Sequence, residues 1–309
     1  MSNHKDTVDA NLKLFNEELS AKYQQREAHN ILPIYFIQHL LNFDLKAPRR
    51  TLDESSIILG DPDLPCNGLT IEKDLPDPKT FISEHPDTPF KPGAKILDFA
   101  CGPGMVTELL APYLKSSTKK SELIGMDINP IFLKSFEERA EKVNDENLTM
   151  KSYEYDILDD SIQDDLKKFE NYFDVIVCTI SYHHIYNYEE VTKKLVTFLK
   201  KSGWLFIVDF YNEDVELKNA PANAAVQHMG GLKTDKLNYV LGDYSGLKNV
   251  SSAREFRTWV WNDESFICSH MNESVLQDFK AGKLRSREDK DMVEYLVPVS
   301  LIYAVGQKE

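Results

Sequence analysis

The 309-residue chain has few cysteines and no long apolar run. Its four cysteines, Cys66, Cys101, Cys178 and Cys268, include no Cys-x-x-Cys pair, so the sequence indicates neither a metal site nor a disulfide framework. No stretch approaches the ~20 apolar residues that a transmembrane helix needs, and the first residues lack a signal-peptide core. We therefore expect a cytoplasmic protein with free thiols, no membrane span and no bound metal.

Basic residues are also scarce relative to acidic ones. The chain has 36 Lys and Arg residues against 50 Asp and Glu residues, and its formal net charge is −14. Because binding to nucleic acid depends mainly on Lys and Arg contacts to phosphate, this balance argues against a nucleic-acid partner. The expected substrate is a small molecule, neutral or cationic.

The most informative segment is KILDFACGPG at 95–104. A short apolar strand carries an acid, Asp98, near its end and breaks into a turn with Gly102 and Gly104, after which a helical pattern begins. Glycine permits positive φ and close approach of a ligand to the backbone, and a helix N-terminus binds anionic groups. A single glycine turn after a strand is more often an ordinary chain reversal than a ligand site. The segments that follow must therefore decide between these two interpretations.

Further strand patterns follow this turn. A second strand ends at Asp127. Its distance along the chain from Gly104 is close to the ~20 residues expected between the glycine turn and an acid that holds ribose hydroxyls. A third, aromatic-rich segment ends at Asp156, and apolar strands are predicted at 172–180 and 201–209 with a helix at 189–199 between them. This alternation predicts an α/β protein with a doubly wound, Rossmann-like sheet.

Five motifs in this order resemble a class I S-adenosylmethionine (SAM) dependent methyltransferase. They are DFACGPG at 98–104, Asp127, YDI at 155–157, FDVI at 173–176 and LKKSGW at 199–204. The resemblance suggests small-molecule methyltransferases similar to the ubiquinone and menaquinone biosynthesis group. This chain departs from the family at Ala100, where glycine is usual and positive φ would be better tolerated.

The resemblance implies a seven-stranded sheet whose antiparallel last strand inserts between its neighbours. Strands expected at 253–261 and 295–305, with a helix around 273–282, fit the pair that closes such a sheet. The expected domains are an N-terminal helical cap at 1–47, a Pro-rich linker at 48–92 with one short strand at 57–59, and a methyltransferase domain at 93–309 with insertions after the fifth strand.

The resemblance also assigns a SAM site, with S-adenosylhomocysteine as the product. The glycine turn would bind the methionyl carboxylate, and Asp98 would face the ammonium group directly or through water. Asp127 would accept from the ribose and Asp156 from the adenine amine. Taken singly, each acid is more simply a solvated strand-end carboxylate, whereas together they favour the cofactor. The expected cofactor-binding residues are Tyr23, Arg26, Asp98, Ala100, Cys101, Gly102, Gly104, Asp127, Ile128, Asp156, Ile157 and Thr179.

Residues 8–45 have a helical pattern that Pro33 is expected to divide into two helices. In similar methyltransferases an N-terminal helix covers the SAM site, so Tyr23 and Arg26 are expected to contact the cofactor. The alternative for this apolar stripe is ordinary core packing. A second closing element is expected at the loop 228–231.

Three histidines are candidates for the catalytic base. His183 and His184 follow the fourth strand at the edge where ligands bind in open α/β sheets, and His228 precedes a double glycine. A pKa near ~6.5 suits histidine for removing a proton at neutral pH. Adjacent side chains diverge, so we expect at most one of His183 and His184 to face the pocket. The alternative is that one is a core or capping histidine and the other lies at the surface. The methyl-accepting atom, oxygen, nitrogen, carbon or sulfur, stays open.

Two other functions share these motifs. A nicotinamide-dependent oxidoreductase usually has Gly-x-Gly-x-x-Gly, whereas Gly104 is followed here by Met105, Val106 and Thr107. A non-catalytic SAM-binding protein would keep the cofactor motifs without an acceptor pocket. The prediction is therefore a SAM-dependent methyltransferase that acts on a small molecule.

Overall fold

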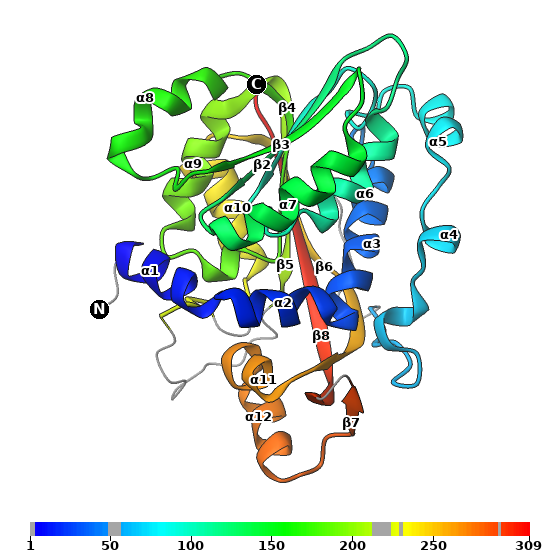
Figure 1. The fold of residues 1–309 in the computed structure, drawn as a ribbon, viewed down its shortest axis with the longest axis vertical. Coiled ribbons are helices and arrows are strands. Elements are labelled where there is room, and N and C mark those ends of the chain that lie inside the picture. Colours follow the sequence, from blue (N-terminus) through cyan, green and yellow to red (C-terminus); the bar gives the residue numbers. More distant parts are fainter. Residues whose placement is uncertain (1–3, 49–56, 212–223, 229–230, 290–291) are drawn as a thin grey trace.

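The computed structural model describes residues 4–48, 57–211, 224–228, 231–289 and 292–309, which form a sheet with helices on both faces (Figure 1). The strands are β1 (Lys95–Phe99), β2 (Ser121–Asp127), β3 (Leu148–Glu154), β4 (Phe173–Thr179), β5 (Leu199–Phe210), β6 (Lys248–Asn262), β7 (Ser286–Asp289) and β8 (Met292–Gln307). The helices are α1 (His4–Leu14), α2 (Glu17–Gln25), α3 (Glu27–Asn42), α4 (Ile71–Asp74), α5 (Pro78–Glu84), α6 (Met105–Leu114), α7 (Pro130–Val143), α8 (Gln163–Leu166), α9 (Tyr188–Phe198), α10 (Thr234–Tyr239), α11 (Glu264–His270) and α12 (Glu273–Lys280). None of the helices in these ranges is long and apolar enough to cross a membrane.

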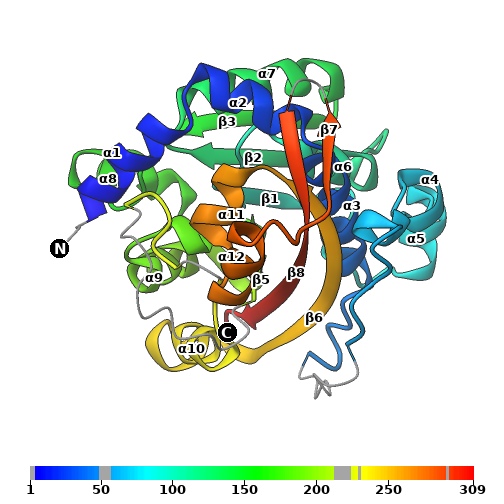
Figure 2. The ribbon, with the colours of Figure 1, turned by 90° about the horizontal axis from the view of Figure 1, so that it is seen from below.

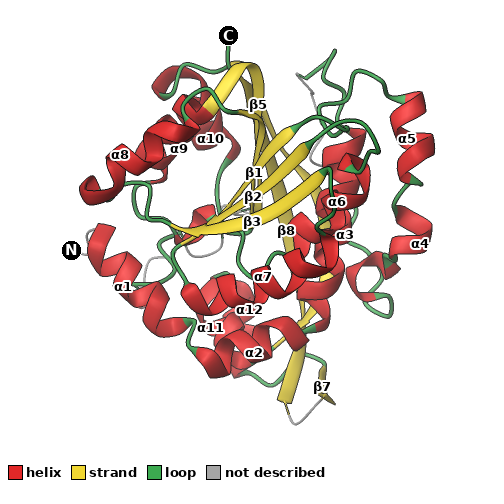
Figure 3. Cartoon of the chain, turned by 45° about the horizontal axis from the view of Figure 1, so that its top comes forward, coloured by secondary structure: helices red, strands yellow, loops and turns green. Residues whose placement is uncertain are grey.

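The strand order is β3-β2-β1-β4-β5-β8-β6, with β7 beside β8 (Figure 3). Strands β1 to β5 are parallel, and β8 runs antiparallel between β5 and β6. The predicted doubly wound sheet with an inserted antiparallel last strand is therefore confirmed. The strands expected at 253–261 and 295–305 correspond to β6 and β8, while the short eighth strand, β7, was not predicted.

Alternate residues of the central strands form two separate hydrophobic cores. In β1, Ile96 faces the core shared with α3, α6 and α7, and Leu97 faces the core shared with α9 and α10; neither side chain is exposed to solvent. Parallel strands covered on both faces need apolar residues at successive positions, which explains the uninterrupted apolar runs in the sequence.

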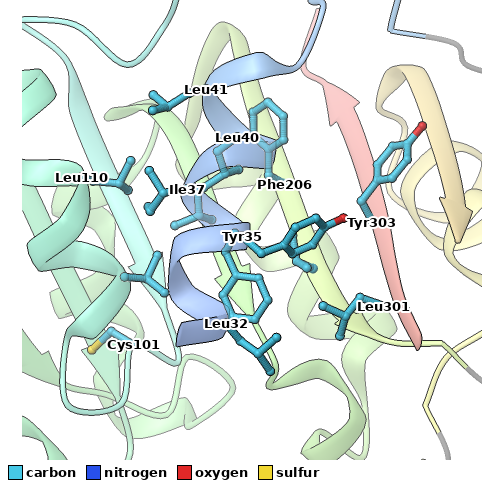
Figure 4. Packing of buried hydrophobic residues seen from close by; sticks show 14 of the residues in the cluster. Leu32, Tyr35, Ile37, Leu40, Leu41, Cys101, Leu110, Phe206, Leu301 and Tyr303 are labelled. Carbon is cyan, nitrogen blue, oxygen red and sulfur yellow. The ribbon is translucent and has the colours of Figure 1, made fainter. Parts of the chain in front are cut away.

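Helix α3 is a core element of the sheet, although the sequence assigned it to a cap. Its residues Ile37 and Leu40 pack between α6 and the strands β5 and β8 (Figure 4). Tyr35 stacks on Phe256 of β6, with 4.0 Å between ring centroids. Full burial of one such aliphatic side chain stabilises the fold by roughly 1.5–3 kcal/mol, so α3 anchors the N-terminal segment to the sheet.

The predicted helix break at Pro33 is wrong. Pro33 lies inside α3, and the helical segments instead divide at residues 15–16 and at Arg26, whose backbone is extended. A proline in a helix interior removes one backbone hydrogen bond. Here the buried face of α3 outweighs that loss.

The Pro-rich segment packs against the same core. It contains α4 and α5, and the short strand expected at 57–59 does not form. Phe81 and Phe90 are 2% and 1% exposed, so they contribute to the core beside α6. The described residues of this segment therefore pack against the core and do not form the loop-like linker that the proline content suggested.

Candidate active site

A cavity of about 280 Å³ lies at the carboxyl ends of β1, β2 and β4. Residues from α1, α2 and α11 complete its lining, and Figure 2 shows α1 and α2 lying across this end of the sheet. Three described residues of the predicted site, Asp98, Gly104 and His228, are not part of the lining. The predicted residues that do line it are Tyr23, Arg26, Ala100, Cys101, Gly102, Asp127, Ile128, Asp156, Ile157, Thr179, His183 and His184.

The glycine turn has three left-handed residues. Ala100, Gly102 and Gly104 have φ values of 54°, 53° and 85°. Ala100 therefore adopts the conformation for which the family uses glycine, at a cost of roughly 1–2 kcal/mol. A Cβ atom added at Gly102 would meet no protein atom within 4 Å, whereas one at Gly104 would lie 2.6 Å from Cδ2 of Phe136. Gly102 thus leaves space at the cavity wall, and Gly104 is required by packing.

Asp127 lies directly beside this turn. Its two carboxylate oxygens accept from the backbone N–H groups of Gly102, at 2.8 Å, and Asn129, at 2.9 Å. Burial raises the pKa of Asp127, while these donors lower it. A carboxylate has about four acceptor positions, so Asp127 keeps capacity for a ligand hydroxyl.

Asp98 lies beneath the turn and is 1% exposed. Thr107 Oγ1 donates to Asp98 Oδ2 at 2.5 Å, and Asp98 Oδ1 is buried without a hydrogen-bond partner. Burial raises the pKa of Asp98 to about 7; the Thr107 bond opposes this shift, and the charge of Asp127 adds to it. Asp98 is not part of the lining, so of the two expected modes of contact with a cofactor ammonium group, directly or through water, the structure favours the second.

The N-terminal segment closes one side of the cavity. His4 Nε2 lies 2.8 Å from Asp156 Oδ2, and the backbone carbonyl of Phe15 accepts from Asn129 Nδ2 at 2.9 Å. The ring of Phe15 contacts those of Phe132 and His184 at centroid distances of 5.3 and 5.7 Å. These contacts hold α1 across the ends of β2 and β3.

Tyr23 and Arg26 reach the cavity from the second helix and the residue that follows it. Burial raises the pKa of Tyr23 to about 12, so its hydroxyl keeps its proton at neutral pH. The Arg26 guanidinium is buried and pairs with Asp263 at the start of α11. Arg26 therefore links the N-terminal helices to α11.

His183 forms a buried pair with Asp209 at the end of β5. Its Nδ1 lies 2.7 Å from Asp209 Oδ1, and its backbone N–H donates to Asp209 Oδ2 at 3.1 Å. The two side chains are 1% and 0% exposed. Since a carboxylate can only accept, Nδ1 carries a proton, and in the neutral imidazole Nε2 then has a free lone pair. Among the described residues, that Nε2 atom is buried without a hydrogen-bond partner.

His184 also lines the cavity, so the expectation that at most one of the two adjacent histidines faces it was wrong. Residues 182–184 form a 3₁₀ turn, in which neighbouring side chains diverge by about 120° rather than pointing to opposite faces. His184 Nδ1 lies 2.6 Å from the backbone oxygen of Ala225. Burial lowers the pKa of His184 to about 3, with a smaller contribution from His183.

His228 lies behind this pair. Its backbone N–H donates to the carbonyl of His183 at 2.9 Å, and its ring packs against Tyr188. It supports the turn that carries His183 and does not reach the cavity.

Four further residues at the site were missed by the sequence reasoning: His4, Asp209, Asn262 and His270. Asp209 ends β5 as Asp127 ends β2, so the same strand-end signal could have indicated it. Asn262 is 2% exposed, lines the cavity and has a side-chain oxygen without a partner. His4 and His270 reach the site through tertiary packing, for which the sequence contains no local signal.

Comparison with known proteins gives consistent matches. A family model described as a methyltransferase domain matches residues 90–255. A Schizosaccharomyces pombe protein described as an uncharacterized methyltransferase is 30% identical over 202 residues, which cover 64% of this chain and 66% of that protein. The match thus spans slightly less than two thirds of that relative's length.

Two solved structures resemble the chain more distantly. A Bacillus halodurans protein assigned as a methyltransferase has 17% identity, covers 74% of this chain and 98% of its own, and gives a TM-score of 0.49. The YcgJ protein of Bacillus subtilis has 14% identity, covers 74% of this chain and 97% of its own, and gives a TM-score of 0.47.

Proposed function

The chain belongs to the methyltransferase-domain family, and we propose that it transfers a methyl group from SAM to a small molecule bound beside His183. The observation that carries this proposal is the position of the buried His183–Asp209 pair. His183, held by Asp209, lines the same cavity as Gly102, Asp127 and other residues expected to hold the cofactor. A cofactor and an acceptor could therefore meet in one enclosed space.

The residues around the glycine turn fit the cofactor. The open space at Gly102 permits close approach to the backbone, and Asp127 keeps acceptor capacity for a ribose diol. Among the described residues, Asp98 Oδ1 is buried without a partner, which makes it the acceptor proposed for the methionyl ammonium group. Bound SAM supplies an electrophilic methyl group on a positively charged sulfur.

The adenine would lie near Asp156, between Ile128 and Ile157. All three residues line the cavity. In the structure His4 Nε2 is already hydrogen-bonded to the carboxylate of Asp156, and both carboxylate oxygens lie within 3.0 Å of it. Adenine binding at this position therefore requires the amine to share that carboxylate with His4 or displace it.

The acceptor side combines apolar and polar side chains. Phe15, Phe210 and Phe266 line it together with His183, His184, His270 and Asn262. Among the described residues, His183 Nε2 and Asn262 Oδ1 are buried without a hydrogen-bond partner. This combination favours a small, largely apolar acceptor that carries an acidic O–H, N–H or S–H group. Asn262 could accept a second hydrogen bond from it.

In the proposed reaction, His183 Nε2 accepts the acceptor's proton and Asp209 stabilises the resulting imidazolium. SAM held beside Gly102 and Asp127 would give its methyl group to the acceptor atom and leave as S-adenosylhomocysteine, and the proton would pass from His183 to solvent. Correct alignment of the reactants can contribute roughly 7–11 kcal/mol. A general base typically adds about 10²–10⁴-fold.

The competing functions differ in observable ways. A non-catalytic SAM-binding protein would bind SAM without turnover, and a nicotinamide-dependent oxidoreductase would bind NADH instead. Calorimetry with SAM, S-adenosylhomocysteine and NADH separates the nucleotides, and formation of S-adenosylhomocysteine across a panel of small phenols, amines and thiols reports transfer. Tight NADH binding without SAM binding would overturn the proposal.

His183 supplies the more specific test. On an acceptor found in that panel, His183→Ala should lower turnover by about 10²–10⁴-fold while SAM affinity stays near the wild-type value. His85→Ala, an exposed change on α5, is the matched control and should leave both quantities unchanged. Normal turnover of the His183 variant would exclude a role for this residue in catalysis.

A further inference from the structure

Three histidines converge at the acceptor end of the cavity. His183 and His184 come from the turn after β4. His270 lies in the last turn of α11, 86 residues after His184. Each has a ring nitrogen that lies within 4.8 Å of a ring nitrogen of each of the other two. The ring centroids are 4.2, 5.2 and 5.7 Å apart. Two distant segments thus bring three imidazoles to one point.

Each imidazole has its Nδ1 atom engaged by a protein acceptor. His183 Nδ1 is 2.7 Å from the Asp209 carboxylate, and His184 Nδ1 is 2.6 Å from a backbone carbonyl. His270 Nδ1 is 2.7 Å from Ser269 Oγ, whose own proton is donated to the carbonyl of Ser265. All three Nδ1 atoms therefore act as donors, which leaves each Nε2 with a free lone pair.

We propose that His183, His184 and His270 bind one zinc ion through their Nε2 atoms, with a fourth position open to the cavity. Three neutral imidazoles are a known zinc ligand set, and an open fourth position is typical of zinc sites that act on a substrate. Hydrogen bonds from the other ring nitrogen to a carboxylate, carbonyl or hydroxyl group orient such ligands. The sequence analysis expected no metal, because only cysteine spacing was informative there.

Zinc binding requires the three ring nitrogens to move closer together. Zinc–nitrogen bonds of roughly 2.0–2.1 Å in a tetrahedral site place the nitrogens roughly 3.3 Å apart, compared with the 4.8 Å limit of the present cluster. Rotation of the His270 side chain could supply most of this change. His270 is also at the C-terminal end of α11, where the helix dipole favours a cation.

The zinc site stands without the proposed function. Its use in catalysis rests on the proposed methyl transfer in this cavity and replaces the role of His183 as the base. The lone pair of His183 cannot bind a metal and accept a proton at the same time. In the zinc-bound protein, an acceptor hydroxyl or thiol would therefore lose its proton through coordination at the open position rather than to His183. This use favours oxygen and sulfur acceptors over carbon.

Cobalt titration of tag-free, chelator-treated, full-length protein tests the site. Co²⁺ should bind with one equivalent per chain, give the visible absorption of a four- or five-coordinate ion, and be displaced by Zn²⁺. His184→Ala and His270→Ala should each abolish this absorption. Asp209→Asn should raise the dissociation constant for Co²⁺ by about 10–100-fold, because it changes only the residue that orients His183.

His228→Ala is the matched control, since His228 lies behind the cluster and outside the cavity. It should bind Co²⁺ as the wild type does. Absence of stoichiometric Co²⁺ or Zn²⁺ binding by the wild-type protein would overturn the proposal, as would binding that survives in His270→Ala. Calorimetry with S-adenosylhomocysteine on the same samples reports separately on the cofactor site, so failure of the metal site and failure of the proposed function are distinguishable.

Discussion

The side chain of His4, in the first turn of α1, is hydrogen-bonded to Asp156 after β3, with 2.8 Å between Nε2 and Oδ2. This bond raises the pKa of His4 above its ordinary value, mainly through the hydrogen bond itself, whereas partial burial opposes the shift. It connects the beginning of the described chain to the residue expected to bind adenine. The position of α1 and the chemistry of the adenine site are therefore coupled.

The first prediction is that α1 loosens as the pH rises. A raised histidine pKa means that the stabilisation is fully present below the unfolded value of about 6.5 and is lost as the pH passes through the folded pKa. Amide protection factors in residues 5–14 should therefore be higher near pH 6 than near pH 9. His4→Ala should remove the difference, and His85→Ala should retain it. Equal protection in the wild type at both values would contradict this interpretation.

The second prediction concerns Asp127. Asp127→Ala removes the carboxylate expected to accept from the ribose and should weaken S-adenosylhomocysteine binding by one to two decades, since charge-assisted hydrogen bonds contribute roughly 1.5–3 kcal/mol. Isothermal calorimetry measures this change. Asp164→Ala, which alters an acid that is 91% exposed, serves as the control and should bind normally. Unchanged affinity of the Asp127 variant would place the ribose elsewhere.

The sheet, and the grouping on one cavity of most residues expected to bind the cofactor, were predictable because their signals are local. Asp127 is identified as the acid that ends its strand, and the two apolar faces of the sheet are visible as the unbroken apolar runs of β4 and β5. Even the departure at Ala100 pointed to the correct backbone, because the alanine adopts the positive φ that glycine usually supplies there. Local geometry and local sequence agree in this region.

The acceptor side could not be predicted in the same way. His270 reaches the cavity because α11 packs under β8, and His4 reaches Asp156 across 152 positions. Neither contact leaves a periodic pattern in the sequence. The sequence left a lid and core packing open for the apolar residues of α3, and tertiary contacts such as that of Tyr35 with Phe256 place this helix in the core.

The third prediction separates the roles of two glycines in one turn. Gly104→Ala forces a Cβ to within 2.6 Å of a Phe136 ring carbon at φ 85°, so it should destabilise the protein by overpacking, at roughly 1–3 kcal/mol, in addition to backbone strain. Gly102→Ala meets no protein atom and should lose only the roughly 1–2 kcal/mol of a left-handed alanine. Its Cβ enters the cavity, so cofactor affinity should fall.

Gly282→Ala is the control for the free-energy cost of placing alanine in a left-handed conformation, which both Gly102→Ala and Gly104→Ala share. Gly282 has φ 67°, and an added Cβ would meet no described atom within 4 Å. The free energies of unfolding measured in urea should be similar for Gly102→Ala and Gly282→Ala. That of Gly104→Ala should be lower than both. Calorimetry should show weakened S-adenosylhomocysteine binding for Gly102→Ala and normal binding for Gly282→Ala. Similar stabilities for Gly102→Ala and Gly104→Ala would show that the Phe136 contact relaxes at little cost.

The fourth prediction is that the buried acid Asp98 destabilises the empty protein at alkaline pH. Its folded pKa of about 7 exceeds the ordinary value of 3.8, so the folded state holds more protons than the unfolded state between these values. Stability contributed by the protonated form is therefore lost as the pH rises through 7, by at most about 4 kcal/mol. Asp98→Asn keeps the shape and an acceptor for Thr107 without the charge.

Urea unfolding of the wild type and Asp98→Asn, measured near pH 4 and near pH 8.5, tests this charge effect. The variant should match the wild type within about 1 kcal/mol at the lower pH and exceed it at the higher pH, because only the wild type must then ionise a buried carboxyl group. Asp164→Asn, at an exposed acid, should show no such divergence. A stability difference between wild type and Asp98→Asn that does not change with pH would mean that Asp98 is already ionised at the lower pH, stabilised by a donor that approaches its free oxygen.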